Sequence, residues 1–449
     1  MDMTQETIEV DVLLKNKQYT ALRQHLTELN DVDIAVIMED LPEADMLKIF
    51  RILPKNTAAD VFAYIEKDNQ QFIINSLSER DAAGIIDNLM ADDATDLLEE
   101  MPANIVKKIL ASASAETRRD INHLLRYPED SAGSIMTVEY VDLKESLTIA
   151  QAIERIREIG LDSETIDTCY VLDNRRTLIG IVGLRYLLLS KPDELISEIM
   201  NEKVISVNTL MDQEEVADKF QKYDFTAMPV VDNENRLVGI ITVDDIVDIM
   251  QQEATEDIEK MAAIVPTDKP YMKMGVVETW KKRIPWLMLL MISATFTGSI
   301  ISSFEDALST CVILTAFIPM LMDTGGNAGG QASVTIIRGL SLHEIEFADM
   351  PKIIWKECRV ALLCGLTLAI TNFFKLLLFD QTGVAVAGVV CITLLATLFI
   401  AKCVGCTLPM FAKKLGFDPA VMASPFITTI VDALSLLIYF QIATYLLGL

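Results

Sequence analysis

Two carboxylate side chains lie within or beside apolar stretches late in the sequence, where they could handle a cation. Asp432 lies in a mostly apolar run, and Asp323 comes just before the Gly-Gly-Asn-Ala-Gly-Gly segment at 325–330. An unpaired carboxylate is costly in hydrocarbon, so such residues are candidates for function. Asp432 is therefore expected to face water or a bundle interior, unless it is a protonated Asp that hydrogen-bonds a neighbouring helix. Asp323 is expected either in a pore or at its inner vestibule.

The glycine-rich segment has two interpretations. Glycines allow close packing of helices, which is common in membranes. Alternatively, a loosened turn exposes carbonyl oxygens to a passing ion. In that case Pro319 frees a backbone carbonyl, while Asn327 and Gln331 add side-chain oxygens. We favour the ion path, because glycine and these polar residues occur more densely in this segment than helix packing requires.

Five apolar stretches surround these residues, at approximately 284–304, 308–340, 360–379, 384–411 and 421–447. Each is long enough to span a hydrocarbon core, which needs about 20 residues. Lys375 and Lys402 lie near the ends of their stretches, and their side chains are expected to snorkel to the interface. The sequence thus predicts an all-α membrane domain of five transmembrane helices at 281–449.

Basic residues predict the orientation of these spans. They lie in three clusters, at 281–283, at 338–359 and at 413–414, and all three fall on the side of the N-terminus. Cytoplasmic loops are enriched in Lys and Arg. We therefore expect a multi-pass protein of the cell membrane with a cytoplasmic N-terminus and an extracytoplasmic C-terminus. The acidic, polar start of the chain has no apolar core typical of a secretory signal.

Charge divides the chain into two parts. The 449 residues carry a formal net charge of -27, yet residues 281–449 hold 11 basic and 10 acidic side chains, which leaves 27 basic and 55 acidic ones for residues 1–280. The chain is too apolar to be disordered and too acidic to attract nucleic acid by charge. Seven dispersed cysteines exclude a disulfide scaffold. His25, His123 and His343 are isolated in the sequence, so no zinc- or copper-selective site is expected.

The first 127 residues show an apolar repeat with a period of 12. A period of this length fits a helix of two turns plus a connection, which predicts an acidic α-superhelical N domain. Its exposed face carries Asp92, Asp93 and Asp96, for which a solvated surface is the simplest interpretation. The repeat consists of Leu29, Leu41, Leu53, Ile65, Leu77, Leu89 and Met101.

The next part of the chain is expected to contain a β-α-β-β-α unit twice, at 128–198 and 199–250. The motifs Ala-Met-Pro-Val-Val-Asp at 227–232 and Gly-Ile-Ile-Thr-Val-Asp-Asp-Ile at 239–246 resemble CBS motifs, so the two units form an α/β CBS-domain pair. Such pairs often hold ATP or another adenosine nucleotide. The first copy departs from this pattern, with Gly183 and Tyr186 where a hydroxyl and an Asp are usual. The resemblance implies four candidate nucleotide contacts: Tyr170, Arg185, Thr242 and Asp245.

An acidic, helix-like run continues from Asp245 to about Met274 and predicts a long connecting helix, placed at 251–280. Glu253, Glu256 and Asp257 crowd one face of this helix. Like charges at such spacings repel. A divalent cation shared with another acidic surface would relieve the repulsion, whereas solvation alone is the simpler alternative.

These parts, in this order, resemble the MgtE family of magnesium channels and transporters. The most specific motifs are Pro319 with the glycine-rich segment, Gly-Phe-Asp-Pro-Ala at 416–420, and Ser424-Pro425 with Thr428 and Asp432. The resemblance implies a homodimer in the lipid membrane, with one pore on its axis and Mg²⁺ as substrate and regulator. It implies these pore residues: Pro319, Gly325, Gly326, Asn327, Gln331, Ser424, Thr428 and Asp432. Asp323 departs from the family pattern, in which a small residue is usual, and is expected to add charge to the pore entrance.

The same resemblance implies cytosolic carboxylates that bind Mg²⁺ and hold the channel closed. Magnesium prefers oxygen ligands in octahedral geometry and keeps much of its water, which fits such a set. A proton- or sodium-coupled divalent cation transporter regulated by nucleotide is the alternative, and a membrane enzyme is disfavoured because no catalytic motif is present. The implied cytosolic metal ligands are Asp92, Asp96, Asp212, Glu214, Asp224, Asp245, Asp248, Glu253, Glu256, Asp257 and Asp418.

Overall fold

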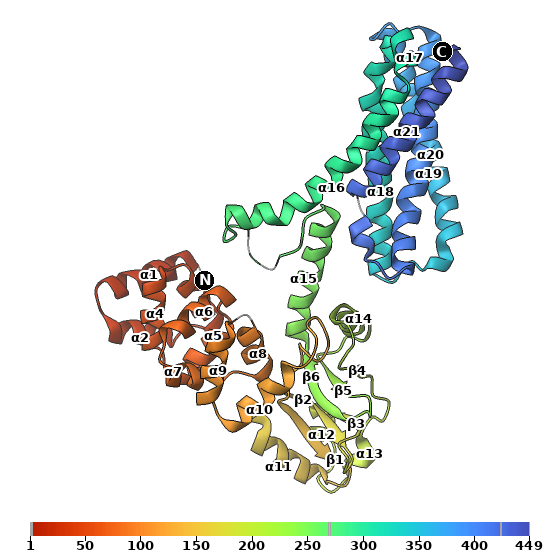
Figure 1. Ribbon diagram of the computed structural model, residues 1–449. Helices are drawn as coiled ribbons and strands as arrows, with labels where there is room; N and C mark the ends of the chain where they lie inside the picture. Colours follow the sequence, from red (N-terminus) through yellow and green to blue (C-terminus); the bar gives the residue numbers. More distant parts are fainter. Residues whose placement is uncertain (1–2, 100, 268, 270, 423, 449) are drawn as a thin grey trace. The chain divides into compact units, whose positions relative to one another are not determined.

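The computed structural model describes residues 3–99, 101–267, 269, 271–422 and 424–448. The chain divides into two compact units, Met1–Met250 and Gln251–Leu449 (Figure 1). The multidomain organisation expected from the sequence is confirmed, with a helical N domain, a CBS pair and a C-terminal region of apolar helices.

Within its described residues, the N domain consists of ten short helices that follow one another with brief connections. The period of 12 arises because each helix ends after two to three turns. Pro42, Pro54 and Pro102 occupy the N-cap positions of α4, α5 and α9. Proline lacks a backbone N–H, but an N–H at this position would have no acceptor within the helix. The helices are α1 Met3–Lys15, α2 Tyr19–Leu26, α3 Asp31–Glu39, α4 Glu43–Ile52, α5 Lys55–Ala63, α6 Lys67–Ser76, α7 Glu79–Ile86, α8 Ala91–Glu99, α9 Ala103–Ser112 and α10 Ala115–Leu124.

One continuous apolar core holds this superhelix together. Ile34, Ile49, Phe62, Ile73 and Ile86 come from different helices along the chain and are fully buried. Their burial stabilises a set of helices that are each too short to persist alone in water.

The CBS pair contains two three-stranded sheets of the same topology. In each sheet the first two strands are parallel and the last two are antiparallel. The predicted β-α-β-β-α order therefore occurs twice. The first copy comprises β1 Tyr140–Lys144, α11 Ile149–Ile159, β2 Thr165–Leu172, β3 Leu178–Gly183 and α12 Leu184–Leu189; the second comprises β4 Val207–Asn208, α14 Gln213–Tyr223, β5 Ala227–Val231, β6 Leu237–Thr242 and α15 Val243–Met261.

Two apolar contacts position the acidic residues of this unit. The two sheets share a small core in which Tyr170 of the first copy packs with Ile240 of the second. Ala91 at the start of α8 belongs to the core of the second copy, together with Ile246 near the start of α15. The first turn of α8 is therefore held against the beginning of α15.

The connecting helix is shorter than expected. It begins at Val243 as part of the second CBS copy and ends at Met261 rather than near Met274. Gly275 then acts as the N-cap of α16, Val276–Ser303.

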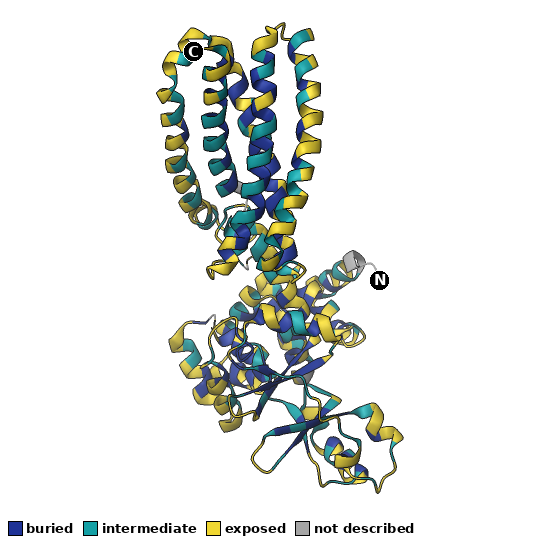
Figure 2. Ribbon diagram, turned by 90° about the vertical axis from the view of Figure 1, so that its right-hand side faces the viewer, coloured by how far each residue is buried: buried dark blue, intermediate teal, exposed yellow. Residues whose placement is uncertain are grey.

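The C-terminal unit is a bundle of long helices. On length and composition, and among the described residues, four helical segments are long and apolar enough to cross a membrane. The other predicted span, at 308–340, instead divides into a short helix, a 3₁₀ segment and the 24-residue helix α18. Figure 2 shows exposed residues along the outer faces of the long helices. The segments after α16 are α17 Glu305–Thr310, η2 Val312–Phe317, α18 Ile318–Ser341, α19 Met350–Leu378, α20 Val384–Lys414 and α21 Ser424–Leu447.

The glycine-rich segment is regular helix, so the expected loosened turn is wrong. Pro319 lies in the first turn of α18, where it frees no carbonyl from an existing helix. A Cβ at Gly325 would lie 2.7 Å from Thr397, and one at Gly329 would lie 2.7 Å from Ile427. The glycines therefore serve the close packing of α18 against α20 and α21, which is the interpretation the sequence analysis disfavoured.

Lys402 does not snorkel to an interface as expected. Its side chain is only 8% exposed, and its ammonium nitrogen lies 3.5 Å from Glu357 of α19. Lys375, by contrast, is half-exposed and pairs with Asp380 at 3.0 Å. The bundle thus contains a buried ion pair between α19 and α20 that the sequence did not reveal.

Candidate functional site

A cavity of about 430 Å³ lies between α18 and α21 and collects most of the predicted pore residues. Its lining is mixed, with apolar side chains, two carboxylates, an amide and a hydroxyl. It is formed by Ile318, Pro319, Met322, Asp323, Gly326, Asn327, Thr428 and Asp432.

The two carboxylates of this cavity come from neighbouring helices. Asp323 lies in the second turn of α18, and Asp432 lies in the third turn of α21. Oδ1 of Asp432 is buried and has no hydrogen-bond partner among the described residues. A carboxylate oxygen buried without a donor is costly, so this atom is suited to a cation or its hydration shell.

A close approach of the backbone makes the cavity possible. A Cβ at Gly326 would lie 2.8 Å from Thr428, so only glycine lets the two helices meet here. Three further predicted pore residues lie elsewhere. Gly325 faces Thr397 and Val431, Gln331 is exposed, and Ser424 begins α21 with a side chain outside the described set.

A second group of carboxylates lies in the first unit, around the start of α8. We call it the α8 acidic cluster. Three of its members are on α8, two precede strands of the first CBS copy, and two open α15. The neighbouring charges help to raise the pKa values of Asp92, Asp93, Glu164 and Asp245. The cluster consists of Asp92, Asp93, Asp96, Glu139, Glu164, Asp244 and Asp245.

Burial and mutual repulsion dominate the electrostatics of this cluster. Burial, followed by the charge of Asp245, raises the pKa of Asp92 well above its usual value. The same causes raise the pKa of Asp93 to about 7. Burial and the charges of Asp244 and Asp245 raise the pKa of Glu164 to about 7. Burial also raises the pKa of Asp245 to about 6, opposed by a hydrogen bond that Thr242 donates at 2.8 Å. Near neutral pH, this group therefore favours protons or a cation.

The cluster brings together three of the predicted metal ligands, Asp92, Asp96 and Asp245. Sequence reasoning did not propose its other four members as ligands. Glu139 and Glu164 are ordinary surface residues by pattern, and only the docking of α8 on the CBS pair brings them near Asp93. The adjacent carboxylates Asp93 and Asp244 were a detectable signal, because each directly neighbours a predicted ligand.

The predicted ligands around α14 lie at both ends of this helix. Asp212 is the N-cap of this helix and accepts a hydrogen bond from the backbone N–H of Glu214 at 2.9 Å. Asp224 is the C-cap and has a left-handed backbone conformation, with φ of 53°. Eleven helical residues, about 16 Å of rise, separate the two ends. Within one chain, Asp212 and Asp224 cap opposite ends of α14 and form no common site.

A third group lies in the C-terminal unit, where the end of α15 meets the loop before α21. Lys260 pairs with both Glu256 and Asp418, at 2.7 Å in each case. Burial, followed by the charge of Asp418, raises the pKa of Asp257. This group unites the predicted ligands Glu256, Asp257 and Asp418 around an ammonium that was not anticipated. Asp248 and Glu253, two further predicted ligands, lie earlier on α15.

The predicted nucleotide residues are only partly assembled. Thr242 is buried and hydrogen-bonds Asp245. Tyr170 is fully buried, and its hydroxyl has no hydrogen-bond partner in the described part of the chain. Arg185 lies at the start of α12.

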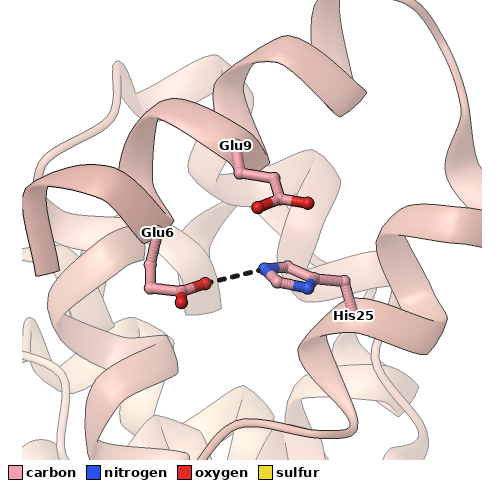
Figure 3. Close-up of side chains that lie close together, drawn as sticks. All are labelled: Glu6, Glu9 and His25. Atoms are coloured by element: carbon pink, nitrogen blue, oxygen red, sulfur yellow. Dashed lines mark ion pairs between the residues drawn. The ribbon is translucent and has the colours of Figure 1, made fainter. Parts of the chain in front are cut away.

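His25 is not isolated, contrary to the expectation from sequence. Glu6 and Glu9 of α1 lie beside it, and one oxygen of Glu6 is 3.0 Å from Nε2 of His25 (Figure 3). The other two histidines differ in surroundings: His123 contacts Tyr127, and His343 lies after α18.

The fold and these sites define a class: a multi-pass membrane protein with acidic N-terminal domains and a cavity lined by two carboxylates within its apolar helices. Family models match three parts of the chain. A divalent cation transporter model, MgtE, matches residues 318–442; the MgtE intracellular N domain matches residues 29–130; and a CBS domain matches residues 196–252.

Characterised relatives cover most of the chain. The magnesium transporter MgtE of Thermus thermophilus is 40% identical over 331 residues, which is 74% of this chain and 73% of the relative. That of Bacillus subtilis is 39% identical over 339 residues, 75% and 74% of the two chains. The chain belongs to the MgtE family of magnesium transporters.

Two solved structures match a little over half of the chain. A crystal structure of the soluble part of a magnesium transporter has a TM-score of 0.54 and 34% identity, covering 56% of this chain and all of its own. The cytosolic domain of the Mg²⁺ channel MgtE in complex with ATP has a TM-score of 0.52 and 36% identity, covering 54% and 99%.

Proposed function

We propose that the chain forms a homodimeric, magnesium-selective channel, with the pore on the dimer axis and gating by cytosolic Mg²⁺. The observation that carries the proposal is the cavity between α18 and α21, with its unpartnered carboxylate oxygen on Asp432. Other polar and backbone groups of the predicted pore line the same space.

The size and chemistry of the cavity suit a hydrated ion. Magnesium dehydrates reluctantly and keeps several waters. Six waters at about 30 Å³ each occupy roughly 180 Å³, which fits within the cavity of about 430 Å³. Asp323 and Asp432 can then attract the ion through its water shell, while Asn327 and Thr428 orient the waters.

Gating rests on the two acidic groups outside the membrane cavity. A divalent cation in the α8 acidic cluster replaces the protons that Asp93 and Glu164 otherwise retain. A cation that binds only when these carboxylates are close together stabilises that arrangement by its differential affinity. High cytosolic Mg²⁺ therefore favours the assembled, closed state, and low Mg²⁺ releases it by repulsion.

The proposal includes a cell-membrane location with the N-terminus in the cytoplasm and the C-terminus outside. The basic residues near the start of α16, between the end of α18 and the first half of α19, and at the end of α20 support this orientation. A second subunit would complete the pore, because the cavity of one chain is lined by only two helices.

The pore assignment is tested by replacing Asp432 with Asn and measuring Mg²⁺ uptake in cells that depend on it. Uptake should fall to the background level. Asp306→Asn is the matched control, since this exposed carboxylate follows α16 and lies outside the cavity. Full uptake by the Asp432 variant would exclude this residue from the pore.

The sensor assignment is tested by the double variant Asp93→Asn, Glu164→Gln. Flux into proteoliposomes should be less inhibited by Mg²⁺ on the cytosolic side. Glu28→Gln with Glu158→Gln removes the same charge from exposed positions outside the cluster. If Mg²⁺ inhibits both double variants and the native chain equally, the cluster has no role in gating.

Ion flux at zero proton and sodium gradient distinguishes a channel from the alternative, a coupled transporter.

We also propose that ATP or another adenosine nucleotide binds the CBS pair near Thr242 and Asp245. Two observations support this: the partly buried hydrogen bond from Thr242 to Asp245, and the ATP complex of a similar cytosolic domain. Since Asp245 also belongs to the α8 acidic cluster, nucleotide is expected to change the Mg²⁺ concentration that closes the channel.

A further inference from the structure

Three side chains with metal-binding atoms converge where α1 meets α2. One ligand atom each from Glu6, Glu9 and His25 lies within 4.8 Å of the others. Figure 3 shows the imidazole of His25 pointing from α2 toward the two carboxylates of α1. No other group of three His, Cys, Asp or Glu ligands reaches this proximity among the residues that the structure describes.

The fold of the two helices holds these side chains in place. Val10 and Leu14 follow Glu6 at intervals of four residues along α1, and both are buried. On α2, Leu22 and Leu26 are fully buried on either side of His25 in sequence. Residues spaced by three or four share a helix face, so the apolar contact between the helices also brings the polar groups together.

The two atoms at the centre of this group pair with each other. Oε2 of Glu6 and Nε2 of His25 are 3.0 Å apart, and both are buried. Apart from this pairing, neither atom has a hydrogen-bond partner among the described residues. A proton on Nε2 of His25 makes this contact a hydrogen bond to Glu6, and a bound cation can take the place of that proton when the imidazole is neutral. Glu9, one helical turn from Glu6, adds a second negative charge on the same face.

We propose that Glu6, Glu9 and His25 bind a divalent first-row transition metal ion, for which Zn²⁺ is the probe. Zinc and the neighbouring first-row transition metals bind imidazole nitrogen and carboxylate oxygen well. Zinc–ligand distances to these atoms are about 2.0–2.2 Å. Three protein ligands leave the remaining positions to water. Two carboxylates neutralise the double charge of the ion, so the site needs no further counter-ion.

This site is chemically different from the magnesium sites proposed above. Magnesium prefers oxygen ligands alone, whereas here a nitrogen is central. The site also lies outside the matched N-domain family model, which begins at residue 29. It therefore gives the N domain a separate response to transition metals, which would tie α1 to α2.

The experiment titrates Zn²⁺ into the purified full-length chain in detergent, against a chromophoric chelator and with a large excess of Mg²⁺. The excess of Mg²⁺ occupies the all-oxygen sites. The native chain should bind one zinc ion that is lost in His25→Ala and in Glu6→Gln. Loss of a direct ligand should weaken binding by more than the roughly 10–100-fold typical of outer-shell changes.

His123→Ala is the matched control, because it removes another N-domain histidine that contacts only Tyr127 among the partners described. It should titrate like the native chain. X-ray absorption at the zinc edge of the native protein should show one imidazole among oxygen neighbours, which requires no variant to fold. Equal zinc binding by the native chain and His25→Ala, or a zinc spectrum without imidazole, would overturn the proposal.

Discussion

The ammonium nitrogen of Lys260 lies 2.7 Å from a carboxylate oxygen of Asp418. Glu256 holds the same nitrogen at the same distance from one helical turn away. Burial opposes the charge of Lys260, but these two bonds outweigh it and raise its pKa. A tethered cation thus already occupies carboxylates that were expected to bind Mg²⁺.

Replacing Lys260 with Met should make closure depend more strongly on Mg²⁺. Without the ammonium, Glu256, Asp257 and Asp418 repel one another at low Mg²⁺, which favours the open state. At high Mg²⁺ the vacated carboxylates are free to bind the ion. Flux into proteoliposomes over a series of cytosolic Mg²⁺ concentrations should show a larger open fraction at the low end. Lys260→Arg keeps the charge and should behave like the native chain; an unchanged inhibition curve for the Met variant would contradict this role.

Binding of Mg²⁺ to the first unit should release protons near pH 6.5. The pKa values of Asp93 and Glu164 are raised to about 7 in the folded chain, so these groups retain protons there that the cation must displace. Titration calorimetry of the full-length chain in two buffers of different ionisation enthalpy measures the number released. The double variant Asp93→Asn, Glu164→Gln should release fewer protons than the native chain. If both release the same number, the α8 acidic cluster is not where Mg²⁺ displaces them.

The same raised pKa values predict how stability varies with pH in the absence of divalent cations. Carboxyl groups whose pKa is raised on folding favour the folded state at low pH. That contribution is fully present below their unfolded values, near 4, and is lost as pH rises through about 7. The denaturant concentration at the midpoint of unfolding should therefore decrease as the pH rises from 4 to about 7. Added Mg²⁺ should flatten this dependence; an increase in stability over the same range would contradict the assignment.

Gly405→Ala should destabilise the membrane unit. A methyl group at this position would overlap the carbonyl oxygen of Gly329 on α18, and a helix backbone cannot move aside without repacking. Overpacking of this kind costs about 1–3 kcal/mol. Gly388→Ala on the same helix is the control, because a methyl group there would meet nothing within 4 Å. Thermal unfolding in detergent should separate the two variants, and equal midpoints would show that the helices adjust freely.

Lys402→Met should be strongly destabilising, because it leaves Glu357 buried without its counter-ion. Removing one partner of a buried pair typically costs about 3–5 kcal/mol. The double variant Lys402→Met, Glu357→Met removes both charges and should regain much of the loss. Thermal unfolding of the two variants measures the difference. A double variant no more stable than the single one would argue against a direct pairing of these residues.

The sequence revealed the repeating elements well, because short-range patterns determine them. The period of 12 predicted the helices whose N-caps include Pro42 and Pro54, and two similar motifs predicted the paired β-α-β-β-α units. The prediction of the connecting helix was less accurate: its acidic pattern continues past Met261, but the helix does not.

Contacts between distant segments account for the features that were missed. Glu164 lies near Asp93 only because Ala91 packs into the core of the second CBS copy. His25 meets Glu6 only through the packing of α1 on α2. The glycines of α18 were assigned to an ion path because composition alone does not distinguish a loosened turn from a tightly packed helix.

That tight packing restricts how the membrane unit can move. α18 touches α20 backbone to backbone at Gly329 and Gly405, and it meets α21 at Gly326 and Thr428. Such close contacts leave little room for rearrangement, so we expect these three helices to shift together as one rigid body. The remaining freedom then belongs to α16, whose most apolar window has no buried residue. Opening is therefore expected to involve a movement of α16 relative to the rigid body of α18, α20 and α21.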